Sequence, residues 1–289
     1  MYLAGLIALT IALAWPAPRL LPRWTAVQAV PGPALWLWQC VSLGAVMAGL
    51  LLAPLAILSV IGDPRGVPSP ADHVVLAVVA ASISGLVVLR LLARGHVVGR
   101  RLRKVRREHR ELVDLVGDAG ELPDDVRVLD HPTATAYCVP GLSRRVVLTS
   151  GTVAALGPQE LQAVLVHELA HLRQRHDLVL EFFTVWHTAV PQRMRSDRGL
   201  EAVSLLIELL ADRVAERAVG RLPVGRALVV LARAEHPSGT LGHADFAQIR
   251  MQELAASRRR PLLAAAVVGL GAVILAAPFV SAAMTVVTR

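Results

Sequence analysis

Cysteine and aromatic residues are scarce in this sequence, and basic residues outnumber acidic ones by 30 to 22. The two cysteines cannot build a disulfide framework, because Cys40 lies in an apolar run and Cys138 in a polar segment. Neither has the spacing of a metal or redox motif, so we expect both to be small buried hydrophobic residues. Aromatic residues make up only 4% of a chain that is 54% hydrophobic. This surplus of aliphatic residues exceeds what an ordinary globular core needs and indicates a membrane protein.

The net charge of +8 is clustered at the borders of apolar runs. One basic run directly follows an apolar stretch and contains a single acidic residue, Glu108. No recognisable nucleic-acid motif lies beside it, so a cytoplasmic membrane flank is favoured over a nucleic-acid site. We therefore expect the lipid bilayer as a partner, and no nucleic acid. The run consists of Arg90, Arg94, Arg100, Arg101, Arg103, Lys104, Arg106, Arg107 and Arg110.

Four apolar stretches are expected to span a membrane, and the first of them is short. The first, residues 1–15, is the shortest and lacks the positively charged start of a signal peptide. The second and third cover residues 34–61 and 73–92. The fourth covers residues 262–287 and contains Pro278, at which a helix would kink.

These spans divide the chain into a membrane domain, a polar domain and a fourth transmembrane helix, over residues 1–94, 95–260 and 261–289. Lys and Arg accumulate on the cytoplasmic side of membranes, so the basic ends of the polar domain, including residues 258–260, predict that it is cytoplasmic. The loop 62–72 sets Arg65 against Asp63 and Asp72 and is expected outside. We expect a multi-pass protein of the cell membrane with both termini outside and no extracellular domain after the last span.

The polar domain combines strand-like and helical patterns. Residues 126–147 have a strand-like pattern with turns near His131 and Pro140, which predicts β structure ahead of the next helix. Gly157 and Pro158 then open a helix, because proline is tolerated at the first helical position. This helix contains the spacing H-E-x-x-H.

His167, Glu168 and His171 form that motif. On a helix, two histidines four residues apart lie one turn above the other, so both imidazoles can reach one metal ion. Catalytic zinc needs three protein ligands, an open position and a general base for the attacking water. The motif supplies two ligands and, in Glu168, the base. Zn²⁺ is the expected cofactor, although other divalent ions can use the same ligand types.

Glu208 is the best candidate for the third ligand and lies in a predicted helix over residues 196–219. Leucine and isoleucine flank Glu208, and a buried carboxylate normally needs a cation or a metal. Asp212 lies four residues further on the same face and would accept a ring N–H from a ligand histidine. An ion pair of Asp212 with Arg213 or Arg217 is the alternative.

Two further histidines, His176 and His187, follow the motif closely. Each could hold a substrate, stabilise an oxyanion or complete a closed four-ligand metal site. A surface or packed histidine is the favoured interpretation of both.

Several motifs together carry a family resemblance. They are A-Y-C at residues 136–138, V-L at 147–148, E-L-Q-A-V-L-V-H-E-L-A-H at 160–171 and E-L-L-A-D at 208–212. The combination resembles the M56 membrane metallopeptidases, the family of the β-lactam sensor-transducers, and more distantly the M48 family of membrane proteases.

The resemblance implies that His167, His171 and Glu208 are zinc ligands, that Glu168 is the catalytic base and that Asp212 supports the site. In the sensor-transducers, a penicillin-binding domain follows the last span and the protease cuts a cytoplasmic repressor. Only two residues follow the last span here, so we expect no β-lactam sensing by a domain of this chain.

We therefore predict a mainly α fold, in which four transmembrane helices carry a cytoplasmic zincin-like α+β metalloprotease domain between the third and the fourth. The expected activity is hydrolysis of peptide bonds in a cytoplasmic or membrane-proximal protein, for example a regulatory protein in signal transduction. The alternative is a membrane signalling or scaffold protein with a non-catalytic metal site. A protein or peptide substrate is the expected partner, and self-association into a homo-oligomer stays open.

Overall fold

The computed structural model describes residues 2–61, 70–118, 123, 125–141, 143–234, 241–256 and 260–287, most of which are helical. Part of the predicted membrane orientation rests on Asp63, Arg65, Arg258, Arg259 and the last two residues, which lie outside the described residues. The chain forms two compact units. The first comprises Met1–Val98, Phe182–Val203 and Arg260–Arg289, and the second Gly99–Glu181 and Ser204–Arg259.

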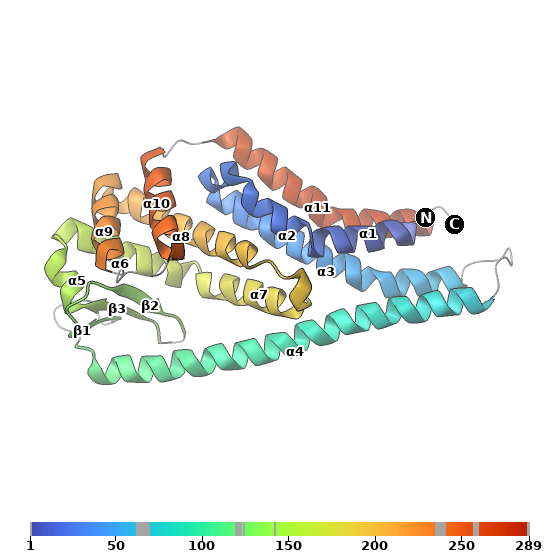
Figure 1. Ribbon diagram of the computed structural model, residues 1–289, viewed down its shortest axis with the longest axis horizontal. Helices are drawn as coiled ribbons and strands as arrows, with labels where there is room; N and C mark the ends of the chain where they lie inside the picture. The colour runs from blue at the N-terminus through green and yellow to red at the C-terminus, as the bar shows by residue number, and fades with distance from the viewer. Residues whose placement is uncertain are drawn as a thin grey trace. The chain divides into compact units, whose positions relative to one another are not determined.

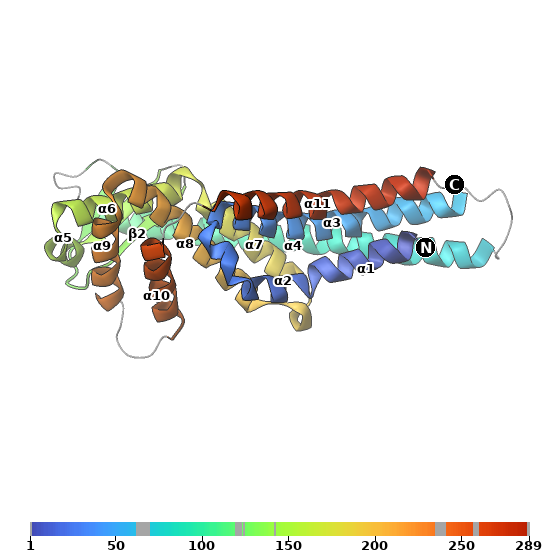
Figure 2. The same ribbon diagram turned by 90° about the horizontal axis from the view of Figure 1, so that it is seen from above.

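The first unit is built mainly from long apolar helices, and α11 lies beside α3 in both views (Figures 1 and 2) and also contacts α1. The helices are α1 (Tyr2–Ala14), α2 (Ala17–Leu20), α3 (Pro31–Ile61), the first part of α4 (Pro70–Val116) and α11 (Pro261–Val287), with the short 3-10 helices η1 (Leu21–Arg23) and η2 (Thr25–Ala29). Four helical segments of the described chain are long and apolar enough to cross a membrane, as the sequence predicts. They are Ala4–Arg23, Pro31–Leu58, Ala77–Val116 and Pro261–Val287.

Helix α4 is longer than the predicted third span. It has 47 residues, which corresponds to about 70 Å, and continues through the basic run to Val116. No proline interrupts it after its first residue, and Arg, Lys, Leu and Glu all favour a helix. The positive charges at the predicted membrane border therefore lie on a continuous helix.

Glycines allow α3 and α11 to approach closely. A side-chain carbon on Gly271 would lie 3.0 Å from Trp36 Nε1 and 3.2 Å from Cys40 Sγ. One on Gly44 would lie 3.2 Å from the carbonyl oxygen of Ile274. Small residues at such positions let membrane helices pack backbone to backbone. Cys40 is buried in this contact, as expected of a small hydrophobic residue.

Residues 182–203 belong to the first unit, although they lie within the predicted polar domain, residues 95–260. They include the end of α7 (His176–Ala189), the 3-10 helix η3 (Gln192–Met194) and the start of α8 (Asp197–Val219). Phe183 packs edge-on against Trp38 with ring centroids 6.3 Å apart. Arg19 donates hydrogen bonds of 2.8 to 3.1 Å to the carbonyl oxygens of residues 193–195. These aromatic and backbone contacts group the segment with the apolar helices, and charge patterning does not reveal them.

The second unit contains the predicted β structure as a three-stranded sheet. Its strands are β1 (Val126–Leu129), β2 (Ala136–Val139) and β3 (Arg145–Thr149), in the order β1-β3-β2. β1 is parallel and β2 antiparallel to β3, with Val126 and Cys138 both opposite Val146. Strand β2 is therefore an edge strand of this sheet.

Helices cover this sheet and complete the second unit. They are the second part of α4, α5 (Ser150–Ala155), α6 (Pro158–Arg173), α9 (Arg221–Ala234), α10 (Leu241–Ala256) and the adjoining parts of α7 and α8. Val146 and Leu148 of the sheet pack with Val164 and Leu172 of α6 in one buried core. Helix α6 lies beside the strands (Figure 1), and α10 lies next to α9 (Figure 2).

Candidate metal centre

Helix α6 presents the H-E-x-x-H motif in the predicted way. The helix begins at Pro158, and the N–H of Gly157 just before it donates to the Glu160 carboxylate at 2.8 Å. Val164 and Leu172 anchor the helix in the core. His167 and His171 then lie one turn apart, and their Nε2 atoms are 3.1 Å from each other.

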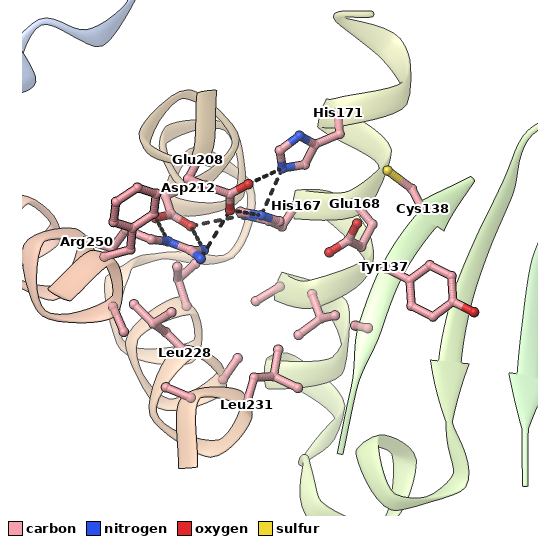
Figure 3. Close-up of a pocket in the computed structure, with 18 of the residues that line it drawn as sticks. Tyr137, Cys138, His167, Glu168, His171, Glu208, Asp212, Leu228, Leu231 and Arg250 are labelled. Carbon is pink, nitrogen blue, oxygen red and sulfur yellow. Dashed lines mark hydrogen bonds and ion pairs between the residues drawn. The ribbon is translucent and has the colours of Figure 1, made fainter. Parts of the chain in front are cut away.

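Glu208 on α8 completes the group (Figure 3). Its oxygens lie 3.3 Å from His167 Nε2 and 3.6 Å from His171 Nε2. Two atoms that bind one tetrahedral zinc ion at about 2.0–2.1 Å are about 3.3 Å apart. The three observed separations bracket this value, so two imidazole nitrogens and one carboxylate oxygen are placed where they could hold a zinc ion.

Asp212 and Arg250 lie behind His167. The Nδ1 atom of His167 is 3.0 Å from Asp212 Oδ1. Arg250 on α10 donates two hydrogen bonds of 2.7 Å to the same carboxylate, and its third nitrogen lies 3.2 Å from Glu208. Asp212, only 5% exposed, thus accepts from a histidine and an arginine at once.

The predicted alternatives for Asp212, ion pairs with Arg213 or Arg217, are replaced by the pair with Arg250. Arg213 lies 3.9 Å from Glu253 instead. Helix geometry could have argued against Arg213, because consecutive residues do not face each other. Arg250 itself was missed, since it lies in another helix and in no motif.

The electrostatics of the group follow from burial and these contacts. Burial works to lower the pKa of His167, but hydrogen bonds to Asp212 and Glu208 outweigh it and raise that pKa to about 10. Burial lowers the pKa of His171 to about 4. Burial works to raise the pKa of Glu208, but its hydrogen bond to His167 prevails and lowers the pKa to about 2. A metal ion that binds His167 must displace a proton, so metal binding should release protons.

Glu168 lies beside the group, between α6 and strand β2 (Figure 3). Burial raises its pKa, and the negative charge of Glu208 adds to this. A raised carboxyl pKa favours proton transfer near neutral pH. Cys138 on β2 lines the same cavity as Glu168, and burial raises the pKa of its thiol, which keeps the thiol neutral. Cys138 therefore touches the site and is more than the packed hydrophobic residue that the sequence predicts.

A cavity of about 490 Å³ opens at the group. One wall is apolar and comes mainly from α6 and α9, and another consists of three successive residues of β2. The apolar wall includes Val164, Val224, Ala227, Leu228 and Leu231, and the β2 wall is Ala136, Tyr137 and Cys138. The cavity therefore joins a polar, ligand-bearing side to an apolar one.

The two further histidines lie in different surroundings. His176 is buried, and its Nδ1 atom lies 3.1 Å from His171 Nδ1, on the side of that ring away from Glu208. His187 lies in the first unit, 3.2 Å from Asp197. Neither contributes a ligand atom to the group formed by His167, His171 and Glu208.

Two histidines and a carboxylate around one point, with a glutamate beside them, are typical of zinc hydrolases. Residues 100–231, which contain all of these side chains except Arg250, match the family model described as peptidase family M48. A stretch of 47 residues is 45% identical to a protein named Protease HtpX homolog from Thermoplasma acidophilum. That stretch covers 16% of this chain and 15% of the relative. No solved structure matches the chain.

These matches support an M48-type metallopeptidase, and together with the apolar helices they support a membrane-associated one. The predicted order of resemblance, M56 before M48, is not supported, because the family model that matches is that of M48. H-E-x-x-H is a general metallopeptidase motif, so it does not by itself distinguish the two families.

Proposed function

We propose that this chain is an integral membrane zinc metalloendopeptidase that hydrolyses peptide bonds of a cytoplasmic or membrane-proximal protein. The observation that carries the proposal is the convergence of His167, His171 and Glu208, with Glu168 beside them. In the proposal these three residues are the zinc ligands, and Asp212 fixes the orientation of His167.

Zinc, when bound, supplies a Lewis acid that activates water and polarises the scissile carbonyl group. Glu168 accepts the proton of the attacking water and later passes a proton to the leaving amine. Its buried position and its raised pKa suit both transfers.

Strand β2 suits the binding of an extended peptide. Side chains of successive strand residues point to opposite faces of a sheet, yet Ala136, Tyr137 and Cys138 all line the cavity. The backbone edge of β2 therefore faces the cavity, and within the described sheet β2 pairs only with β3. A substrate segment could add as a further strand there and receive main-chain hydrogen bonds.

The cytoplasmic placement of the peptidase segment is part of this proposal. Arg100, Arg101, Arg103 and Lys104 of α4 are exposed and follow the third apolar stretch. Such a concentration of basic residues is typical of the cytoplasmic flank of a membrane span. A regulatory protein near the membrane is the substrate class that this placement favours.

A non-catalytic metal site in a scaffold protein would need a fourth protein ligand. In the described part of the chain, the group contains three ligand residues, and Glu168 lies next to it in the place of a base. His176, the nearest further histidine, lies behind His171. This arrangement favours an open, catalytic site.

Replacing Glu168 with Gln tests the proposal. The variant keeps the three ligands but cannot accept a proton, so we expect cleavage of a labelled casein by the detergent-purified protein to fall by about 10²–10⁴-fold. Zinc content, measured by elemental mass spectrometry, should stay near that of the wild type. Glu201→Gln, at an exposed position of α8, is the matched control and should cleave normally. Full activity of Glu168→Gln with an active wild type would overturn the mechanism.

A further inference from the structure

His176 is a polar side chain that the proposed mechanism does not use, and it is only 3% exposed. It is the first residue of α7, directly after the turn that follows α6. In that turn Arg175 has a φ of 54°, a left-handed conformation that costs free energy for a residue other than glycine. The turn directs the chain so that the His176 ring packs edge-on against the His171 ring, with centroids 4.9 Å apart.

The two rings and Gln174 form a short chain of polar atoms. His171 Nδ1 lies 3.1 Å from His176 Nδ1, and His176 Nε2 lies 3.2 Å from the side-chain oxygen of Gln174. The other ring nitrogen of His171, Nε2, faces His167 and Glu208. His171 therefore presents one nitrogen to the candidate metal position and the other to His176.

Only one arrangement of protons satisfies all of these contacts when His171 Nε2 is a ligand. A ligating Nε2 carries no proton, so the neutral His171 ring carries its proton on Nδ1. His176 Nδ1 must then accept, which leaves the proton of His176 on Nε2. From there it is donated to the Gln174 carbonyl oxygen, which can only accept.

We propose that His176, oriented by Gln174, is a positioning residue that accepts the Nδ1–H of His171 and thereby fixes the tautomer and ring orientation in which His171 binds the metal. The inference rests on the ligand set of the proposed function. Metal-ligating histidines usually donate their second ring N–H to a carboxylate, a backbone carbonyl or water. In this chain the neutral imidazole of His176 is the acceptor for His171. The carboxylate of Asp212 is the acceptor for His167.

Two substitutions of His176 distinguish the effect of losing the hydrogen-bond acceptor from the effect of changing the side-chain volume. His176→Leu fills similar space without an acceptor, whereas His176→Asn keeps an oxygen at the position of Nδ1. We expect the Kd for Zn²⁺, measured on the full chain in detergent by competition with a fluorescent chelator, to rise about 10- to 100-fold in the Leu variant. The Asn variant should recover most of this loss. His187→Leu, at the other end of α7, is the matched control and should leave the Kd unchanged.

The outcomes distinguish this inference from the proposed function. An unchanged Kd in His176→Leu, or an equal loss in the Leu and Asn variants, would overturn the positioning role while leaving the peptidase untouched. In a further outcome, the Kd rises in the Leu variant and recovers in the Asn variant while the wild type binds zinc but cleaves no casein. That result would support the positioning role and count against the peptidase. A wild type that binds no zinc would overturn both. Thermal unfolding of each variant in excess chelator shows whether the metal-free fold is intact.

Discussion

His167 and His171 occupy equivalent positions on successive turns of α6, yet the groups behind them differ in chemistry. Behind His167 lies the charged pair of Asp212 and Arg250, whose members are 38 residues apart and lie on separate helices. Behind His171 lies the neutral pair of His176 and Gln174, which comes from the turn directly after α6. One metal-binding motif thus depends on both tertiary structure and a local turn.

The difference has an energetic consequence. Hydrogen bonds to charged groups contribute about 1.5–3 kcal/mol and neutral ones about 0.5–1.5 kcal/mol, and a charge left buried without its partner costs more than either. The support of His167 should therefore be the stronger and the more costly to break. Three substitutions test this ranking.

Arg250→Met should have the largest effect, and on stability. It leaves the charge of Asp212 buried with only His167 to donate to it, so we expect the free energy of unfolding to fall by about 3–5 kcal/mol. Thermal unfolding of the metal-free protein in detergent measures the change. Arg213→Met, which removes a longer ion pair with Glu253, is the control and should cost about 1 kcal/mol or less. Equal losses of unfolding free energy in the two variants would show that the pair of Asp212 and Arg250 contributes no more to stability than the pair of Arg213 and Glu253.

Asp212→Asn should act mainly on metal affinity. The amide oxygen can still accept from His167 Nδ1, but the charge that makes the imidazole a better ligand is gone. We expect zinc affinity to fall about 10- to 100-fold. Chelator competition at fixed pH measures it. A wild-type Kd would mean that the charge behind His167 does not influence the ligand.

Gln174→Ala should have the smallest effect. It removes the acceptor for His176 Nε2–H and so allows the His176 proton to move to the nitrogen that faces His171. The lost neutral hydrogen bond is worth about 0.5–1.5 kcal/mol, which corresponds to about a 2- to 10-fold rise in the zinc Kd. The same competition assay detects this. A larger loss than that of Asp212→Asn would reverse the ranking of the two supports.

The predicted site residues that the structure brings together share a simple physical basis. The spacing of His167 and His171 follows from helix periodicity alone, and the structure brings their side chains together. Glu208 stood out as an acid among aliphatic residues, and the structure places it with the two histidines. The strands around residues 126–147 and the start of α6 followed from alternation and from turn residues.

The missed residues depend on geometry that a pattern does not contain. Arg250 reaches Asp212 only because α10 packs on α9 in the fold. His176 reaches His171 only because Arg175 adopts a positive φ. A glycine or asparagine would have indicated this backbone conformation in the sequence, but an arginine does not. Cys138 lines the same cavity as Glu168 because β2 forms one wall of that cavity, which the sequence of the strand does not show. Residues 182–203 lie in the first unit, and the charge pattern does not contain their contacts with Trp38 and Arg19.

The close pairing of α3 with α11 bears on how the chain is made. The ribosome completes α3 long before it reaches α11, and the entire second unit is synthesised between the two. Domains generally fold as units during synthesis, so the metal-binding unit can fold first. The face of α3 around Gly44, against which α11 packs, lacks this partner until α11 has been synthesised. The contact between α3 and α11 can therefore form only after the second unit has been synthesised.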